Sequence, residues 1–419
     1  MTLNKVFSIV LISLIFLTLY IPSGSAALIW SKTYGGTNAE YGFSFVQTSD
    51  DGYAIVGSII TYGSGSSYSS DSWLIKTDVA GDLQWSKTFG GAGTNLLSSL
   101  VETSDGGFAL GGFTNSSGGS EGDMWLVKTN SKGDIQWSKN YGDTNHEIAN
   151  SIVQTSDGGF ALAGAKGPGG DFNDFCLVKT DSAGDLLWSK TYGGEGNDVA
   201  QSLVQTTDGG YAMVGFLNNY PWLVRVDSTG SMQWNKTYGE LIYGESGINL
   251  GSVIQSEDGG YVLVGYNNQK AWLVKTDSSG NLQWNKTYDQ GFVAYSVVQT
   301  NDGGYALAGQ VVGNGVFDFW LAKTDNTGNV QWAQNYVGGQ GEVTVMQTSD
   351  GGYALLGSIN PTGANYDSDI WLIKTDTNGI TASTSTHTVP EFSLFAIIFV
   401  LLISSVFILF FRSRYSTNK

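Results

Sequence analysis

Four polar residues recur at one position of a repeated sequence, and they are the first candidates for chemistry. Each stands six residues before the valine of a Val-Gln-Thr or Val-Glu-Thr tripeptide: Glu40, Asn95, Glu147 and Asp198. Clustered carboxylate and amide oxygens are the ligands that Ca²⁺ prefers, and a pair of carboxylates can hydrolyse a glycosidic bond. If the repeats close into a ring, the four residues are expected to form an arc at one mouth of it, as a Ca²⁺ or sugar site. The alternative is that each residue caps the first strand of its own repeat.

The groups that other hydrolytic mechanisms need are scarce. The chain has two histidines, His146 and His387, so a Ser–His–Asp triad or a histidine-based zinc site has almost no material. We therefore predict no catalytic residues and no cofactor beyond the Ca²⁺ alternative, and we expect a protein that is not an enzyme. The enzyme alternative is an extracellular polysaccharide hydrolase or lyase that uses two carboxylates among Glu40, Glu147 and Asp198.

These residues must be positioned by a repeat of about 50 residues, a period typical of repeat architectures. The 13 tryptophans give its register, because they fall into two sets. One set stands in runs such as Leu-Gln-Trp-Asn-Lys-Thr-Tyr: Trp30, Trp85, Trp137, Trp188, Trp234, Trp284 and Trp332. The other stands in runs such as Trp-Leu-Val-Lys-Thr-Asp: Trp73, Trp125, Trp222, Trp272, Trp320 and Trp371.

Each repeat predicts four short strands. In the third repeat they are expected at 151–155, 160–164, 174–180 and 185–192, because these stretches are rich in β-branched and aromatic residues and are separated by Asp, Ser and Gly. Seven such repeats predict an all-β fold, a seven-bladed β-propeller of four-stranded antiparallel blades. Residues 27–34 have the sequence of a fourth strand, and the last repeat lacks one. We therefore expect 27–34 to pair with 369–375 and to close the ring.

A basic residue stands three places after the second tryptophan position of each repeat: Lys76, Lys128, Lys179, Arg225, Lys275, Lys323 and Lys374. An Asp or Asn follows two residues later, and this spacing predicts an ion pair repeated at the strand ends. The Asp of each Asp-Gly-Gly sequence is expected to form a hairpin turn.

The loops between the second and third strands vary in length, and variable loops on a rigid scaffold often carry binding sites. Five tyrosines in the variable loops are candidates for stacking on sugars, or are ordinary surface residues: Tyr62, Tyr68, Tyr220, Tyr243 and Tyr366.

The ends of the chain carry export and anchoring signals. Residues 1–26 place Lys5 before an apolar run and small residues, which predicts a secretory signal peptide, with an uncleaved anchor as the alternative. The propeller is expected at 27–377 and a Ser/Thr-rich stalk at 378–391. Residues 392–411 are uncharged and long enough to span a membrane. The basic tail at 412–419 predicts a cytoplasmic C terminus and an external propeller.

The net charge of the chain limits the classes of partner that it is expected to bind. A formal net charge of −17 at pH 7 disfavours nucleic acid and anionic membrane surfaces. Three Asn-x-Ser/Thr sequences are candidates for N-glycosylation, at Asn115, Asn235 and Asn285. Together these features predict a non-catalytic cell-surface protein that binds an extracellular glycan or a surface protein. A structural cell-envelope protein is a further alternative.

The repeat resembles known families. Trp-Ser-Lys-Thr-Tyr-Gly-Gly, followed by Asp-Gly-Gly-Tyr-Ala-Leu, is similar to the β-propeller repeat of bacterial and archaeal surface proteins. The spacing from Asp277 through Gly280 to Trp284 resembles the tryptophan-docking repeat of pyrroloquinoline-quinone enzymes. That resemblance implies a Trp packed between blades, while the cofactor-binding residues of the family have no counterparts here. The hairpin around Asp157 resembles the Asp box of sialidases, but sialidase chemistry needs an arginine cluster and the predicted propeller has only Arg225.

The C-terminal end resembles a sorting signal. Pro390, Glu391 and Phe392, followed by an apolar helix and a short basic tail, look like the PEF-CTERM signal of archaeal surface proteins. The resemblance implies an archaeal host and an archaeosortase-like processing enzyme that exchanges the helix for a lipid anchor.

Overall fold

The structure, a computed structural model, describes residues 29–62, 68–91, 93–115, 122–167, 173–218, 220–239, 251–313, 316–360 and 368–381. The chain divides into two compact units, Met1–Ala382 and Ser383–Lys419. The predicted signal peptide, most of the stalk, the sorting motif, the 392–411 segment and the basic tail lie outside the described residues. Within the described ranges, no helix has the length and apolar character needed to cross a membrane.

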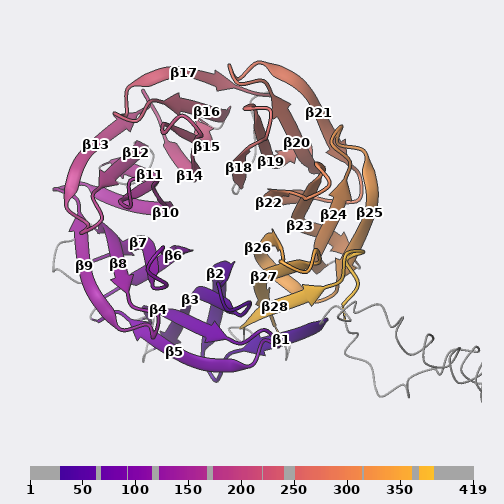
Figure 1. Ribbon diagram of the computed structural model, residues 1–419, viewed down its shortest axis with the longest axis horizontal. Helices are drawn as coiled ribbons and strands as arrows, with labels where there is room; N and C mark the ends of the chain where they lie inside the picture. The colour runs from indigo at the N-terminus through magenta and orange to yellow at the C-terminus, as the bar shows by residue number, and fades with distance from the viewer. Residues whose placement is uncertain are drawn as a thin grey trace, which may run out of the picture. The chain divides into compact units, whose positions relative to one another are not determined.

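The described strands form seven four-stranded antiparallel sheets arranged as blades around a central axis (Figure 1). Blade 1 contains β2 (Ala39–Gln47), β3 (Tyr53–Tyr62), β4 (Tyr68–Thr77) and β5 (Leu83–Phe89); blade 2 contains β6 (Asn95–Glu102), β7 (Phe108–Thr114), β8 (Asp123–Thr129) and β9 (Ile135–Tyr141). Blade 3 contains β10 (His146–Gln154), β11 (Phe160–Gly167), β12 (Asp174–Thr180) and β13 (Leu186–Tyr192); blade 4 contains β14 (Asp198–Gln205), β15 (Tyr211–Leu217), β16 (Tyr220–Val226) and β17 (Met232–Thr237). Blade 5 contains β18 (Ser252–Gln255), β19 (Tyr261–Asn267), β20 (Lys270–Thr276) and β21 (Leu282–Tyr288); blade 6 contains β22 (Val293–Gln299), β23 (Tyr305–Gly313), β24 (Val316–Thr324) and β25 (Val330–Tyr336). Blade 7 contains β26 (Gly339–Gln347), β27 (Tyr353–Ile359), β28 (Asp369–Thr375) and the N-terminal β1 (Trp30–Tyr34).

The N-terminal strand closes the ring, as predicted. β1 pairs antiparallel with β28, with Trp30 opposite Lys374 and Tyr34 opposite Ile370. Trp371 Nε1 also donates a hydrogen bond to Ser31 Oγ at 2.7 Å. The seven-bladed propeller and its closure by the N-terminal strand are therefore confirmed.

The first strand of each blade lies nearest the axis (Figure 1), and in every blade but blade 5 its described part contains a β-bulge or similar shift of register. In β10 the register shifts between Ala149 and Ser151, so this strand begins at His146 and not at the predicted residue 151. The bulge breaks the alternation of side chains that identifies a strand in sequence. β10 is an edge strand of its sheet, and its outward N–H groups can bond to the neighbouring blade: Ile152 N donates to Ser99 Oγ of blade 2 at 3.1 Å.

Neighbouring blades are joined by the tryptophans of the outer strands. The Trp137 ring of blade 2 packs on Gly184 in the last turn of blade 3, where an added Cβ would lie 2.7 Å from the ring. Gly184 has a φ of +78°, which favours glycine at this turn. The same ring lies edge-on to Phe160, with 5.9 Å between centroids. The equivalent Trp–Gly contacts at the other six junctions are Trp30–Gly81, Trp85–Gly133, Trp188–Gly230, Trp234–Gly280, Trp284–Gly328 and Trp332–Gly379.

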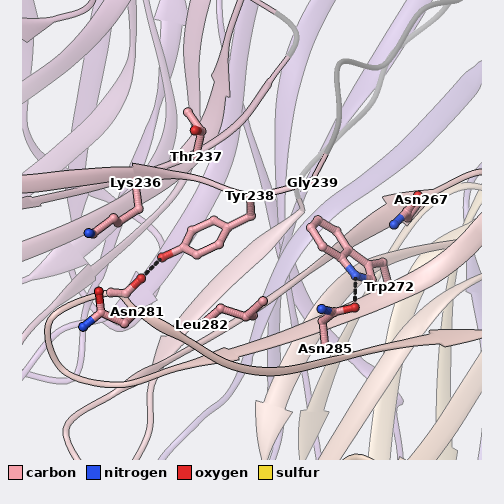
Figure 2. A pocket seen from close by; sticks show the side chains of 10 residues that line it. Lys236, Thr237, Tyr238, Gly239, Asn267, Trp272, Asn281, Leu282 and Asn285 are labelled. Carbon is pink, nitrogen blue, oxygen red and sulfur yellow. Dashed lines mark hydrogen bonds between the residues drawn. The ribbon is translucent and has the colours of Figure 1, made fainter.

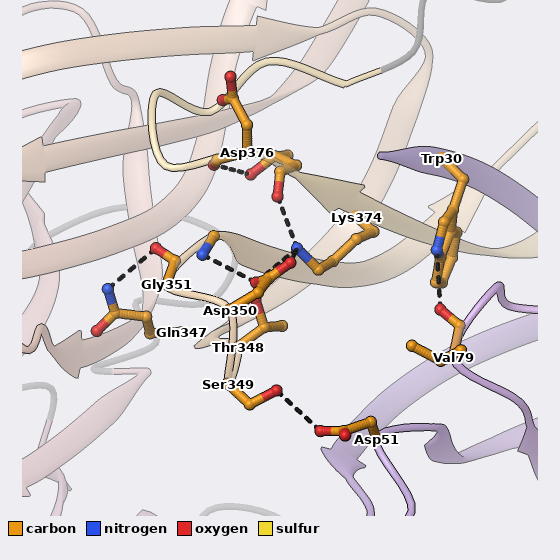
Figure 3. A network of polar contacts seen from close by, with 12 residues as sticks. Trp30, Asp51, Val79, Gln347, Thr348, Ser349, Asp350, Gly351, Lys374 and Asp376 are labelled. Atoms are coloured by element: carbon orange, nitrogen blue, oxygen red, sulfur yellow. Dashed lines mark hydrogen bonds and ion pairs between the residues drawn. The ribbon is translucent and has the colours of Figure 1, made fainter. Parts of the chain in front are cut away.

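An ion pair between a buried basic residue and an exposed aspartate is repeated in all seven blades, but its aspartate is not the one that the spacing predicted. In blade 3, Lys179 Nζ lies 2.9 Å from Asp157 of the Asp-Gly-Gly turn. Asp181, two residues after Lys179, instead accepts hydrogen bonds within its own turn, because β12 ends at Thr180 and the chain turns there. Figure 3 shows the pair in blade 7, Lys374 with Asp350. The other pairs are Lys76–Asp50, Lys128–Asp105, Arg225–Asp208, Lys275–Asp258 and Lys323–Asp302.

Candidate functional site

The four residues of the predicted arc lie at the beginnings of four consecutive inner strands, β2, β6, β10 and β14. Their side chains are buried, with exposed fractions of 3% for Glu40, 1% for Asn95, 2% for Glu147 and 0% for Asp198. The partners found for each belong to its own blade or to the blade before it. Gly36 N, for example, donates to Glu40 Oε2 at 3.1 Å, and Gly194 N donates to Asp198 Oδ2 at 3.0 Å. The structure thus places the four side chains at separate blade junctions.

At three of these junctions a second carboxylate approaches the first across a glycine. A Cβ added to Gly193 would lie 2.2 Å from Asp174 Oδ1 and 2.6 Å from Asp198 Oδ2. The other two pairs are Asp123 with Glu147 at Gly142, and Asp369 with Glu40 at Gly35. Any side chain on these three glycines would meet both carboxylates, so this packing requires glycine after the outer strands β1, β9 and β13.

The four junctions differ in how they balance the charge. In blade 3, Lys166 Nζ lies 3.0 Å from Glu147 Oε1 and 2.7 Å from Asp143 Oδ2. Burial raises the pKa of Glu147, and Lys166 opposes that shift. At the start of blade 2, Asn95 replaces the acid, and its amide oxygen accepts a hydrogen bond from Thr114.

The Asp174–Asp198 pair has no such lysine, because Leu217 is opposite Asp198 in the sheet. Burial raises the pKa of Asp198, hydrogen bonds from Gly194 N and Asn218 N oppose the rise, and the Asp174 charge adds to it. Burial also raises the pKa of Asp174. The Asp174 charge thus opposes the ionisation of Asp198.

The described ranges contain no group of three or more His, Cys, Asp or Glu side chains placed to hold a metal ion. Ca²⁺ binding at Glu40, Asn95, Glu147 and Asp198 remains a prediction. A catalytic pair drawn from these carboxylates also remains a prediction, and the two partners would have to act from different blade junctions.

The candidate glycosylation residues differ in position. Asn235 and Asn285 lie on the outer strands β17 and β21, where their amide oxygens accept hydrogen bonds from Trp222 Nε1 at 3.2 Å and Trp272 Nε1 at 3.3 Å. In blades 2 and 7 a serine accepts the corresponding bond. The Asn115 side chain accepts a hydrogen bond from Thr94 N at 2.7 Å.

The other predicted residues are only partly within the described ranges. Among the loop tyrosines, Tyr220 is 36% exposed, while the side chains of Tyr62, Tyr68, Tyr243 and Tyr366 lie outside the description. The His146 ring lies 5.5 Å from that of Phe113, between centroids.

A cavity of about 580 Å³ lies between blades 4 and 5. Blade 4 contributes Lys236, Thr237 and Tyr238, followed by Gly239. Blade 5 contributes Asn267 from the end of β19, Trp272 from β20, and Asn281, Leu282 and Asn285 from β21 and the turn before it. Tyr238 and Trp272 are buried, whereas Leu282 is 52% exposed. Figure 2 shows Lys236 and Asn281 on one side of the Tyr238 ring and Trp272 on the other.

The polar groups around this cavity differ from those at three of the other junctions. At three other junctions the equivalent lysine is paired with an aspartate of the next blade: Lys32 with Asp82, Lys87 with Asp134, and Lys139 with Asp185. At the cavity Asn281 replaces that aspartate, and Lys236 has no ion pair within the described part of the chain. The ten residues lining the cavity include no carboxylate.

Sequence reasoning missed this site because its residues belong to the repeat. Tyr238, Trp272 and Lys236 stand at positions where most blades have the same residue type. The available signal was a departure from the repeat, namely Asn281 where Asp82, Asp134 and Asp185 stand elsewhere, and Asn285 where most repeats have Ser.

Comparison with known proteins gives the fold and nothing finer. The sequence matches no protein-family model, and no curated protein is significantly similar to it. Among solved structures, the Dos1 propeller is 13% identical with a TM-score of 0.51, over 83% of this chain and 96% of the other. Sqt1 from Chaetomium thermophilum is 13% identical with a TM-score of 0.50, over 85% of this chain and 87% of the other. A protein of unknown function from Dyadobacter fermentans is 10% identical with a TM-score of 0.47, over 84% and 99% of the two chains.

Proposed function

We propose that the protein is a non-catalytic propeller at the cell surface, which binds an extracellular glycan or a surface protein. The observation that carries the proposal is the cavity between blades 4 and 5. Its lining combines apolar surface, from Leu282, Tyr238 and Trp272, with amide groups and one lysine that forms no salt bridge to any residue that the structure describes. Cavities with an apolar lining and a few placed polar groups are typical of ligand sites.

The titratable residues outside the cavity favour a binding function over catalysis. The six lysines and one arginine that pair with an aspartate of the turn between the first and second strands stabilise those turns. Glu40, Glu147 and Asp198, which the hydrolase alternative would use, are buried at separate junctions. A glycosidase needs two carboxylates on either side of one bond, so this arrangement favours the binding function.

The cellular location follows from the sequence alone. The export signal at 1–26, the apolar segment at 392–411 and the basic tail support an exported propeller held at the membrane. The Pro390-Glu391-Phe392 motif supports an archaeal surface protein whose C-terminal helix an archaeosortase-like enzyme exchanges for lipid.

Two assays on the purified protein test this function. A glycan array and a pull-down of surface proteins should give specific binding, while incubation with the same polysaccharides should give no new reducing ends or unsaturated products. Turnover that disappears in Glu147→Gln would overturn the non-catalytic proposal.

A further inference from the structure

We propose that the cavity between blades 4 and 5 binds a neutral oligosaccharide, held by Asn285, Asn281 and Lys236 over an apolar floor. This inference rests on the proposed binding function and narrows it to one site and one class of ligand.

The size and floor of the cavity suit a short saccharide segment. Its volume of about 580 Å³ falls within the range of roughly 300–1,000 Å³ found for ligand pockets. Leu282 supplies exposed apolar surface for the C–H groups of sugar rings, and the largely buried Tyr238 and Trp272 line the same cavity. The Tyr238 hydroxyl is held by its own bond to Gly280 O at 2.7 Å, so the floor is fixed before a ligand arrives.

The polar groups have donors and acceptors left for hydroxyls. Asn285 Oδ1 accepts from Trp272 Nε1, and its Nδ2 is turned away from the indole (Figure 2). Asn281 Nδ2 donates to Asp277 at 3.0 Å, which leaves Oδ1 as an acceptor. Lys236 carries three N–H donors and forms no salt bridge among the described residues, whereas Lys32, Lys87 and Lys139 each bind an aspartate of the next blade. Hydroxyl groups both donate and accept, so they match this mixture.

Charge favours a neutral sugar. The lining offers one ammonium and no carboxylate. An anionic polysaccharide would gain one ion pair there, but it would approach a chain with a formal net charge of −17. A neutral chain meets no such repulsion and can still use Lys236 as a hydrogen-bond donor.

The first test uses the repeat as its own control. Asn285→Ser introduces the residue that accepts the indole bond in blades 2 and 7, so the variant should fold, yet it removes the amide from the cavity. Asn235→Ser makes the same change in blade 4, at a residue that does not line the cavity. By calorimetry with a neutral oligosaccharide found on a glycan array, Asn285→Ser should bind about two- to tenfold more weakly. Asn235→Ser should bind as the wild type does.

The second test restores the pattern of the other junctions. Asn281→Asp should form the Lys236 ion pair seen three times elsewhere. We expect the melting temperature to be unchanged or raised and saccharide binding to be weakened. Asn329→Asp is the matched control, because Asn329 accepts from Lys286 at the next junction and is not part of the cavity.

The possible outcomes distinguish a failure of the proposed site from a failure of the proposed binding function. Saccharide binding that is equal in wild type, Asn285→Ser and Asn281→Asp overturns the assignment of this cavity and leaves the binding function standing. Binding of uronic or sulfated saccharides alone overturns the neutral class. Wild-type protein that captures a surface protein but no saccharide overturns this inference while the wider function holds, and capture of neither overturns both.

Discussion

Single carboxylates in this molecule have two opposite environments. The aspartates in the turns between the first and second strands are exposed, and each pairs with a buried lysine or arginine. For Asp157, burial raises the pKa, but hydrogen bonds from Thr155, Lys179 and Gly159 N outweigh it and hold the pKa at about 2. The junction acids Asp174 and Asp198 have raised pKa values instead. The first kind stabilises the fold when ionised, and the second kind stabilises it when protonated.

Removing the charge of one turn aspartate should therefore destabilise the fold. Asp157→Asn keeps an oxygen acceptor for the turn but leaves the Lys179 ammonium, whose side chain is 5% exposed, without a counter-ion. We expect a loss of about 1–3 kcal/mol in the free energy of unfolding from urea titration. Asp185→Asn, at a 70% exposed partner of Lys139, should change it by less than about 1 kcal/mol. Equal losses would mean that the buried lysine does not depend on its aspartate.

Neutralising one of the two junction acids should stabilise the fold, which is the opposite of the effect expected for Asp157→Asn. An acid whose folded-state pKa is raised costs stability as the pH rises through that pKa. Asp174→Asn removes the charge that helps raise the pKa of Asp198, so it should raise the melting temperature at pH 7. The gain should shrink towards about pH 4, where the wild-type pair is increasingly protonated. Asp185→Asn removes the same net charge in the same blade and controls for overall repulsion; an equal gain there would refute the pairwise effect.

At the scale of strands and turns, a tryptophan of each blade packs on a turn glycine of the next blade. Gly184 of blade 3 lies under Trp137 of blade 2, and Tyr141 OH donates to Gly184 O at 2.7 Å. One turn thus receives both an aromatic ring and a hydroxyl from its neighbour. Blade 1 is an exception, because Phe89 stands where the other outer strands end in tyrosine.

A pair of glycine substitutions should measure this docking. Both Gly184 and Gly158 have positive φ, so alanine at either should cost about 1–2 kcal/mol in backbone strain. At Gly184 the added Cβ would also lie 2.7 Å from the Trp137 ring, whereas at Gly158 the nearest atom is 3.9 Å away. Gly184→Ala should therefore lose clearly more unfolding free energy than Gly158→Ala. Equal losses would show that the tryptophan moves aside without cost.

The strands and their ring order were predictable from the sequence because the tryptophans and Asp-Gly-Gly turns repeat at fixed positions. The ion-pair partner was not, since spacing along the chain placed Lys179 with Asp181 while the sheet brings it to Asp157. The arc of Glu40, Asn95, Glu147 and Asp198 stays a prediction, and the spacing could not show that each of these side chains is buried at the start of its inner strand. The cavity depends on small departures from the repeat at Asn281 and Asn285.

At the scale of the whole molecule, the ring depends on its first strand. β1 covers the edge of β28, and Trp30 packs on Gly81 and lies edge-on to Tyr53, with 5.6 Å between centroids. The network in Figure 3 continues across the same junction, where Ser349 Oγ donates to Asp51 at 2.8 Å. Blade 7 is therefore held to blade 1 by contacts from both ends of the chain.

Deleting residues 27–34 should expose the β28 edge and cause concentration-dependent association, because unpaired edges template intermolecular pairing. Light scattering after size-exclusion chromatography would measure it, together with the melting temperature. Trp30→Ala is the control: it keeps the strand but should lose about 3–5 kcal/mol of stability while remaining in the wild-type association state. A deletion variant with unchanged melting and association would contradict the role of closure.

Because ring closure joins the first and the last strand of the propeller, the first strand cannot pair until the last has been synthesised. Ser31 and Trp371, which bond to each other across the seam, are 340 residues apart. At roughly 5–20 residues per second, the ribosome needs on the order of tens of seconds to make the chain between them. Throughout that interval the first strand has no partner of its own, and neighbouring nascent chains carry the same strand. Crowded synthesis should therefore favour exchange of β1 between copies, giving closed rings that are linked in pairs.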